Sequence, residues 1–139
     1  MSEPNKPLRL MFVDDDADIV PLYEMVGRID DTLITVRKGG LSALQFLHEL
    51  NYDVDAVILD LSMPDMDGIT LTEQIRRNEG LRSKQTPIRI FWFTGWEFDA
   101  DNPADTIMLA KQENHVEEIF KKPIPPVDLV TEVKQRLNA

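Results

Sequence analysis

Short apolar runs alternate along the chain with segments in which apolar residues recur every three or four positions. The runs cover residues 8–13, 32–36, 56–59, 88–93 and 116–120. An apolar or β-branched run bounded by polar or turn residues is typical of a strand that is buried on both faces of its sheet. The pattern therefore predicts five strands.

The segments that follow these runs have helical periodicity. They predict helices over about residues 17–29, 41–50, 69–78, 106–113 and 127–137. Pro21 is compatible with a helix only in the first turn, where its missing N–H needs no partner, so we expect the first helix to begin near Ala17. Gly80 is a natural stop for the third helix.

Five repeats of strand then helix, joined by short connections and right-handed crossovers, predict an α/β fold. We expect a single doubly wound (βα)5 domain, with a five-stranded parallel sheet covered by helices on both faces. A length of 139 residues suits one domain. Residues 1–7 are polar with two prolines and predict a flexible N-terminal arm, which leaves residues 8–139 for the domain.

Composition narrows the function classes. A chain that is 42% apolar and 29% charged is typical of a soluble globular domain, and the lack of cysteine excludes disulfides, thiolate zinc sites and cysteine catalysis. We expect a cytoplasmic protein without membrane insertion, because no apolar run approaches the roughly 20 residues that span a bilayer and no export signal begins the chain. The net charge of −10 disfavours direct nucleic acid binding, which needs clustered lysine and arginine.

Polar residues stand at the point where each of four predicted strands ends. Asp14 and Asp15 follow the first strand, Asp60 the third, Thr94 the fourth and Lys122 the fifth. Ligands of open α/β sheets bind at the carboxyl ends of the strands, beside the point where the strand order reverses. We therefore expect these five side chains to converge on one site.

Three neighbouring carboxylates repel one another and cannot all ionise without a cation. Aspartate and backbone carbonyl oxygens, together with water, suit Mg²⁺. The cluster of Asp14, Asp15 and Asp60 thus predicts an octahedral Mg²⁺ site that would also hold the oxygens of a phosphoryl group. Lys122 offers a point charge and Thr94 a hydroxyl to that group, while a free oxygen of Asp60 can attack phosphorus and form an aspartyl phosphate.

Four motifs occur in order along the chain: Val13-Asp14-Asp15-Asp16, Asp60-Leu61-Ser62-Met63-Pro64-Asp65-Met66-Asp67-Gly68, Thr94-Gly95 and Lys122-Pro123. Together they resemble the motifs of the response-regulator receiver domain, the phosphoacceptor of two-component signalling. The resemblance extends from about residue 8 to residue 137. It implies a flavodoxin-like fold with strand order 2-1-3-4-5 and a cis peptide bond before Pro123.

The resemblance also implies a role for each site residue. Asp60 is the residue that would be phosphorylated. Asp15 and Asp60 would bind Mg²⁺ directly, the backbone carbonyl of Ser62 would add a ligand, and Asp14 would act through water. Lys122 would contact the phosphoryl group.

The relay of the signal departs from the family pattern. The resemblance makes Thr94 the switch hydroxyl, but Ile119 stands where the family usually has Tyr or Phe, three residues before the lysine. Phe120 and Trp96 are candidate substitutes for that ring, and Trp96 follows Thr94 closely enough to limit water access to an acyl phosphate.

We expect a stand-alone receiver that takes a phosphoryl group from a histidine kinase or a histidine phosphotransfer protein, with self-catalysed transfer and autodephosphorylation as its only chemistry. Because the chain ends soon after the last helix, its output is expected to be contact with another protein through residues 106–113, 116–120 and 127–137. A phosphorylation-independent interaction module on the same fold is the alternative. An aspartyl phosphatase generally needs a second Asp where Ser62 stands.

Overall fold

A computed structural model of the chain describes residues 7–16, 18, 20–25, 28–29, 32–82, 86–95, 101–102 and 105–138. Its strands are β1 (Leu8–Val13), β2 (Arg28–Ile29), β3 (Thr32–Arg37), β4 (Ala56–Leu59), β5 (Arg89–Thr94) and β6 (Glu118–Lys121). Its helices are α1 (Val20–Met25), α2 (Gly40–Glu49), α3 (Gly68–Leu81), α4 (Thr106–Glu113) and α5 (Pro126–Leu137). None of these helices has the length and apolar character of a membrane-spanning segment.

The described strands form one sheet in the order β2-β3-β1-β4-β5-β6. All neighbours from β3 to β6 pair in parallel, so the five predicted strands have the predicted order, 2-1-3-4-5. The short β2 strand is an addition that the sequence did not predict. It pairs antiparallel with β3 through Arg28–Leu33 and Ile29–Thr32 and extends one edge of the sheet.

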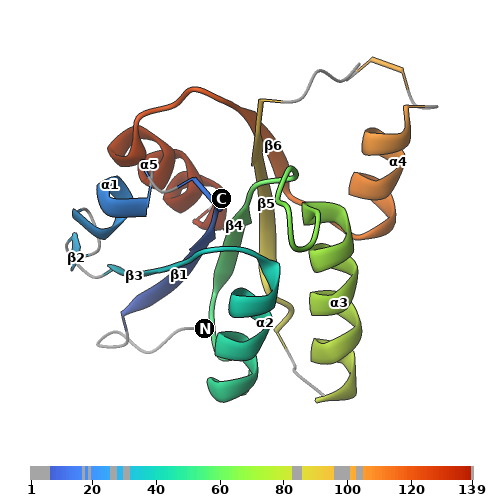
Figure 1. Cartoon of the computed structure of the whole chain (residues 1–139), viewed down its shortest axis with the longest axis horizontal. Coiled ribbons are helices and arrows are strands. Elements are labelled where there is room, and N and C mark those ends of the chain that lie inside the picture. The colour runs from blue at the N-terminus through green and yellow to red at the C-terminus, as the bar shows by residue number, and fades with distance from the viewer. Residues whose placement is uncertain are drawn as a thin grey trace.

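Helices cover both faces of the sheet, as predicted (Figure 1). Successive side chains of a strand point to opposite faces. Met11 and Val13 of β1 pack under α2, α3 and α4, whereas Leu10 and Phe12 pack under α1 and α5. The strands β4 and β5 divide their apolar side chains in the same way. This double burial explains why the strands appear in the sequence as continuous apolar runs.

Two helix boundaries differ from the sequence prediction. Helix α1 begins at Val20 and not near Ala17, although Pro21 still lies in the first turn, where its ring and missing N–H are tolerated. Ile29, expected at the end of that helix, lies in β2. Helix α3 continues through Gly80 to Leu81, because nothing there requires the left-handed conformation that makes glycine a helix stop.

Helix α4 packs on the core through the partly buried Ile107 and Ala110 and is also held at its C-terminal end. None of its residues is buried. The guanidinium of Arg76, on α3, donates hydrogen bonds to the carbonyls of Asn114 at 2.8 Å and His115 at 3.1 Å, just after α4. The buried Glu79 accepts from Arg76 at 2.6 Å and from the N–H of Ile88 at 2.9 Å, which ties the same corner to the start of β5.

Candidate functional site

The register of the central strands brings two aspartates together. Val13 of β1 lies opposite Leu59 of β4, so Asp14 and Asp60 emerge side by side where these strands end. Their backbones remain fixed beyond the strands. The N–H of Asp60 donates to the carbonyl of Val13 at 3.0 Å, and the N–H of Asp14 donates to the backbone carbonyl of Arg37 at 3.1 Å. Both carboxylates therefore project from rigid backbone.

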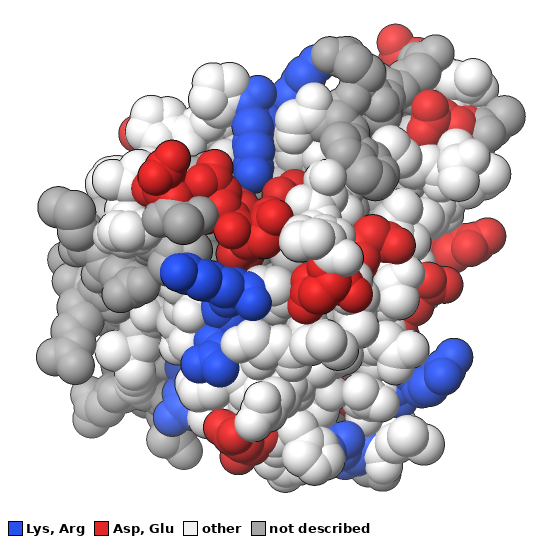
Figure 2. Space-filling model, viewed as in Figure 1, with Lys and Arg blue, Asp and Glu red and all other residues white. Residues whose placement is uncertain are grey.

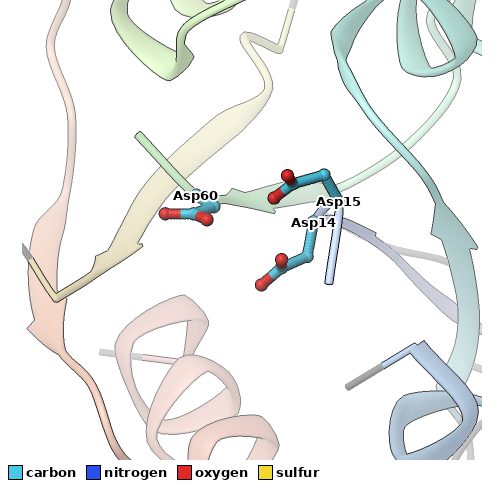
Figure 3. A group of neighbouring side chains, drawn as sticks. All are labelled: Asp14, Asp15 and Asp60. Carbon is cyan, nitrogen blue, oxygen red and sulfur yellow. The ribbon is translucent and has the colours of Figure 1, made fainter. Parts of the chain in front are cut away.

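Asp15 completes a cluster of three carboxylates. One oxygen from each of Asp14, Asp15 and Asp60 lies within 4.8 Å of the others (Figure 3). Asp14 and Asp60 are buried, whereas Asp15 is exposed at the mouth of the site. Figure 2 shows acidic side chains gathered over this edge of the sheet. A set of oxygen donors without histidine or cysteine fits a hard cation such as Mg²⁺.

Lys122, the residue after β6, reaches the cluster. Its Nζ atom lies 2.9 Å from Oδ2 of Asp14 and 3.4 Å from Oδ2 of Asp60, and 5.3 Å from the centre of the Phe93 ring. The backbone N–H of Lys122 donates to the carbonyl of Thr94 at 2.9 Å, and the Lys122–Pro123 peptide bond is cis, as expected. One ammonium group therefore bridges both buried carboxylates.

The charges of the site are set by burial and by these contacts. Burial raises the pKa of the Asp60 carboxyl, and neither the ammonium of Lys122 nor the N–H of Ser62 fully offsets that rise. Burial alone would lower the pKa of Lys122, but its contacts with Asp14 and Asp60 outweigh burial and raise it. The lysine is therefore firmly charged, while the Asp60 carboxylate needs further positive charge to be fully stabilised.

An open cavity of about 430 Å³ lies in front of the cluster. The residues that line it are Asp14, Asp15, Asp16, Asp60, Ser62, Thr94, Gly95 and Lys122. The N–H of Ser62 donates to Oδ1 of Asp60 at 3.2 Å, which fixes the orientation of that carboxylate. The structure thus gathers all six residues that the sequence assigned to phosphoryl and metal binding, and it adds Asp16 and Gly95.

Of the residues expected to relay the signal, Thr94 lines this cavity, and the others that the structure describes lie elsewhere. Ile119 does not line the cavity and packs, partly buried, against the core beneath α4. Phe120 faces the opposite side of the sheet, where its ring stacks on Phe91 at 6.0 Å between centroids. Trp96 lies outside the described residues.

Two contacts that hold helix α3 were missed in the sequence. Asp67 caps α3 by accepting the N–H of Thr70 at 2.8 Å, and an aspartate just before a helix is a signal that could have revealed it. The indole N–H of Trp92 donates to the Thr72 hydroxyl at 2.9 Å, and that hydroxyl donates to the carbonyl of Gly68 at 2.7 Å. No local pattern marks this second contact, because its partners lie on separate elements.

A second cavity of about 400 Å³ adjoins the acidic one and shares Lys122 with it. Its other lining residues are apolar apart from the Tyr23 hydroxyl, and they come from α1, the end of β5 and the segment before α5. Leu22, which is 47% exposed, and Ile124 are among them. An apolar hollow therefore lies directly beside the charged site.

Comparisons with known proteins agree with this geometry. A family model described as the response regulator receiver domain matches residues 10–134. The chain is 29% identical over 131 residues to the DNA-binding response regulator MtrA of Mycobacterium tuberculosis, a match that covers 94% of this chain and 50% of MtrA. The chain thus spans about half the length of that relative.

Solved structures share the fold. The chemotaxis response regulator CheY4 of Vibrio cholerae gives a TM-score of 0.71 at 18% identity, with 94% of this chain and 99% of that chain covered. A CheX–CheY–BeF3–Mg²⁺ complex from Borrelia burgdorferi gives 0.72 at 18% identity, with 94% and 89% covered. At these identities the likeness concerns the fold alone. Because the family model matches most of its length, the chain belongs to the response regulator receiver domain family.

Proposed function

We propose that Asp60 accepts a phosphoryl group from the phosphohistidine of a histidine kinase or histidine phosphotransfer protein, in a Mg²⁺-dependent reaction. The observation that carries this proposal is the position of the Lys122 ammonium, 2.9 Å from Asp14 and 3.4 Å from Asp60. An ion pair that served only stability would need one carboxylate beside Lys122. Here two buried carboxylates, those of Asp14 and Asp60, lie beside the exposed carboxylate of Asp15, and a site that binds further positive charge explains this excess of negative charge.

The proposed metal ligands are those that the family resemblance implies. The carboxylates of Asp15 and Asp60 and the backbone carbonyl of Ser62 would hold Mg²⁺ directly, and Asp14 would act through water. When bound, Mg²⁺ supplies positive charge that offsets the carboxylates and the oxygens of the transferred phosphoryl group. The Borrelia burgdorferi complex supports the choice of Mg²⁺ as the metal, since it holds a CheY together with BeF3 and Mg²⁺.

The transfer itself needs one nucleophilic oxygen in a fixed position. The N–H of Ser62 holds Oδ1 of Asp60 and Lys122 lies beside Oδ2, so the carboxylate cannot rotate freely. An oxygen of Asp60 attacks phosphorus and forms the new P–O bond while the P–N bond of the donor breaks. The imidazole nitrogen keeps the electron pair of the broken bond. Lys122 stabilises the charge on the phosphoryl oxygens during the transfer.

The apolar cavity beside the site suits the donor. A donor must bring its histidine to Asp60, and the hollow lined by Leu22, Phe93 and Ile124 is an adjoining surface that can supply binding energy. An apolar side chain from a donor helix would fill it without placing a charge beside Lys122. We propose this hollow as the place where the donor docks.

Output would pass through the surface formed by α4, β6 and α5. Thr94, buried where β5 ends, would bond the phosphoryl group, and Ile119 would adjust beneath α4. We propose contact with another protein as the output, because the net charge of −10 disfavours direct nucleic acid binding by this domain. The name of MtrA describes a DNA-binding regulator, and this chain corresponds to about half of that protein.

The test is to incubate the chain with acetyl phosphate, with and without Mg²⁺, and to measure the intact mass. We expect the gain of one phosphoryl group that requires Mg²⁺ and is absent in Asp60→Asn. No gain in the wild type, or an equal gain in Asp60→Asn, would contradict the proposal. Partner binding that is identical in both proteins would instead favour the phosphorylation-independent module, which the aliphatic Ile119 leaves open.

A further inference from the structure

We infer that Asp65 is a positioning residue for the metal side of the acidic site, and that it acts through the loop that carries Ser62. This inference rests on the proposed Mg²⁺ site. Asp65 does not line the acidic cavity and lies three residues beyond Ser62. Its carboxylate is instead bound to a different element, the N-terminus of α2.

The contact is a helix cap supplied from a distance in the sequence. Oδ1 of Asp65 accepts the N–H of Gly40 at 3.3 Å, and Oδ2 accepts the N–H of Leu41 at 3.0 Å. The first N–H groups of a helix have no partner within the helix. The residue at the N-cap of α2, Gly39, has no side chain that could serve them. The hydrogen bond from the N–H of Leu41, and to a lesser extent that from Gly40, lowers the pKa of the Asp65 carboxyl. The carboxyl is therefore charged at neutral pH.

Two glycines make room for this contact. Gly39 has a φ of +90°, and a Cβ atom there would lie 2.8 Å from Oδ2 of Asp65. A Cβ atom on Gly40 would lie 3.0 Å from Cβ of Met66. The loop and the start of α2 are therefore in direct contact along two successive residues, and the loop cannot move toward α2.

The same loop carries Ser62, whose backbone carbonyl is a proposed metal ligand. Its two ends are fastened together, because the N–H of Gly68 donates to the carbonyl of Leu61 at 2.8 Å. Between these ends, Ser62 bonds Asp60 on one side of the loop and Asp65 bonds α2 on the other. We therefore expect the Asp65 tether, together with these bonds, to fix the direction of the Ser62 carbonyl.

Calorimetric titration with MgCl2 tests this inference on the full chain. We expect Asp65→Ala to bind Mg²⁺ about tenfold more weakly, which is the low end of the effect of losing a partner that orients a metal ligand. Asp65→Asn keeps an amide oxygen that can accept the N–H of Leu41, and it should lose much less affinity. High salt in all titrations removes most of the difference in long-range charge.

Asp67→Ala is the matched control. It also removes an exposed acidic helix cap from the same loop, but that cap serves α3 and not α2. Asp67→Ala should retain most of the Mg²⁺ affinity that Asp65→Ala loses. Hydrogen exchange supplies a readout without metal, since the Ser62 amide should exchange faster in Asp65→Ala than in Asp65→Asn.

Each contrary result points to a different error. Equal losses in Asp65→Ala and Asp65→Asn would show that the charge matters and the tether does not, which would overturn the inference. Wild-type affinity and wild-type exchange of Ser62 in Asp65→Ala would overturn it as well. A wild-type chain that fails to bind Mg²⁺ would instead overturn the proposed function, and the exchange rates would still decide whether the tether holds the loop.

Discussion

Helix α3 contains two glycines whose replacement by alanine should have opposite effects. At Gly68, a Cβ atom would lie 2.4 Å from the carbonyl oxygen of Asp60, 2.7 Å from Cδ1 of Leu59 and 2.7 Å from Cα of Leu61. Two of these three neighbours are backbone atoms, one in Asp60, the proposed phosphoacceptor, and one in Leu61 beside it. At Gly80, a Cβ atom would meet nothing within 4 Å.

The expected magnitudes follow from these distances. Gly68→Ala forces backbone to shift, and overpacking of this kind costs about 1–3 kcal/mol. Gly80→Ala lies in ordinary helical backbone and should stabilise the fold by about 0.5 kcal/mol, because alanine loses less conformational freedom than glycine. For a chain of 139 residues, each kcal/mol shifts the melting temperature by about 3–4 °C. The two variants should therefore melt on opposite sides of the wild type.

Thermal and urea unfolding, followed by circular dichroism, would measure both changes. Because the shift at Gly68 moves the backbone of Asp60 and Leu61, Gly68→Ala should also bind Mg²⁺ more weakly, whereas Gly80→Ala should bind it as the wild type does. A Gly68→Ala variant with wild-type stability and Mg²⁺ affinity would refute the reasoning. So would an equal loss of stability in both variants, since the crowding is confined to Gly68.

Three further outcomes are expected. Burial holds the pKa of Asp60 in the folded state above its value in the unfolded chain. The ionised carboxylate therefore lowers the free energy of unfolding at pH values above the folded-state pKa, and this loss of stability disappears as pH falls through that pKa. Metal-free Asp60→Asn should therefore be more stable than the wild type at neutral pH, and urea unfolding across a pH series should show the difference shrinking toward acid pH. Lys122→Met leaves the carboxylates of Asp14 and Asp60 without their cation and should cost about 1–3 kcal/mol without metal. Urea unfolding should show Mg²⁺ recovering part of that loss, and an equal loss with Mg²⁺ would contradict the compensation. Thr72→Val removes the acceptor of the buried Trp92 indole and should cost about 1–3 kcal/mol, whereas Thr72→Ser should unfold in urea close to the wild type.

The parallel sheet could be predicted because each of its strands is buried on both faces and therefore forms an apolar run of its own. The β2 strand could not, since two residues carry no periodicity and its existence depends on pairing with β3. The prediction ended α3 too early, because the effect of a glycine also depends on the backbone conformation of the folded chain. Glycine ends a helix where the chain needs a left-handed residue, and at Gly80 the chain continues as a helix.

The sequence was enough to predict which residues form the site, but not which contacts they make. Asp14, Asp60 and Lys122 follow strand ends, and parallel strands bring their carboxyl ends to one edge. The bond between Lys122 and Asp14 joins residues 108 positions apart, and the bonds of Asp65 to Gly40 and Leu41 span 25 and 24 positions. Such pairs depend on the folded geometry, and the local pattern around Asp65 indicates only a turn.

Arg76 fixes one end of helix α4, and none of the residues of α4 is buried. Both features affect how the domain divides its population between alternative positions of α4. Only partly buried residues of α4, Ile107 and Ala110, pack against the core, so we expect a tilt of α4 about its fixed end to cost little free energy. Moving a two-state equilibrium from 1:99 to 99:1 takes about 5.5 kcal/mol of differential binding. If two positions of α4 differ little in free energy, phosphorylation and the binding of a partner protein can each supply part of that amount. Both would then shift an equilibrium that exists before either of them acts.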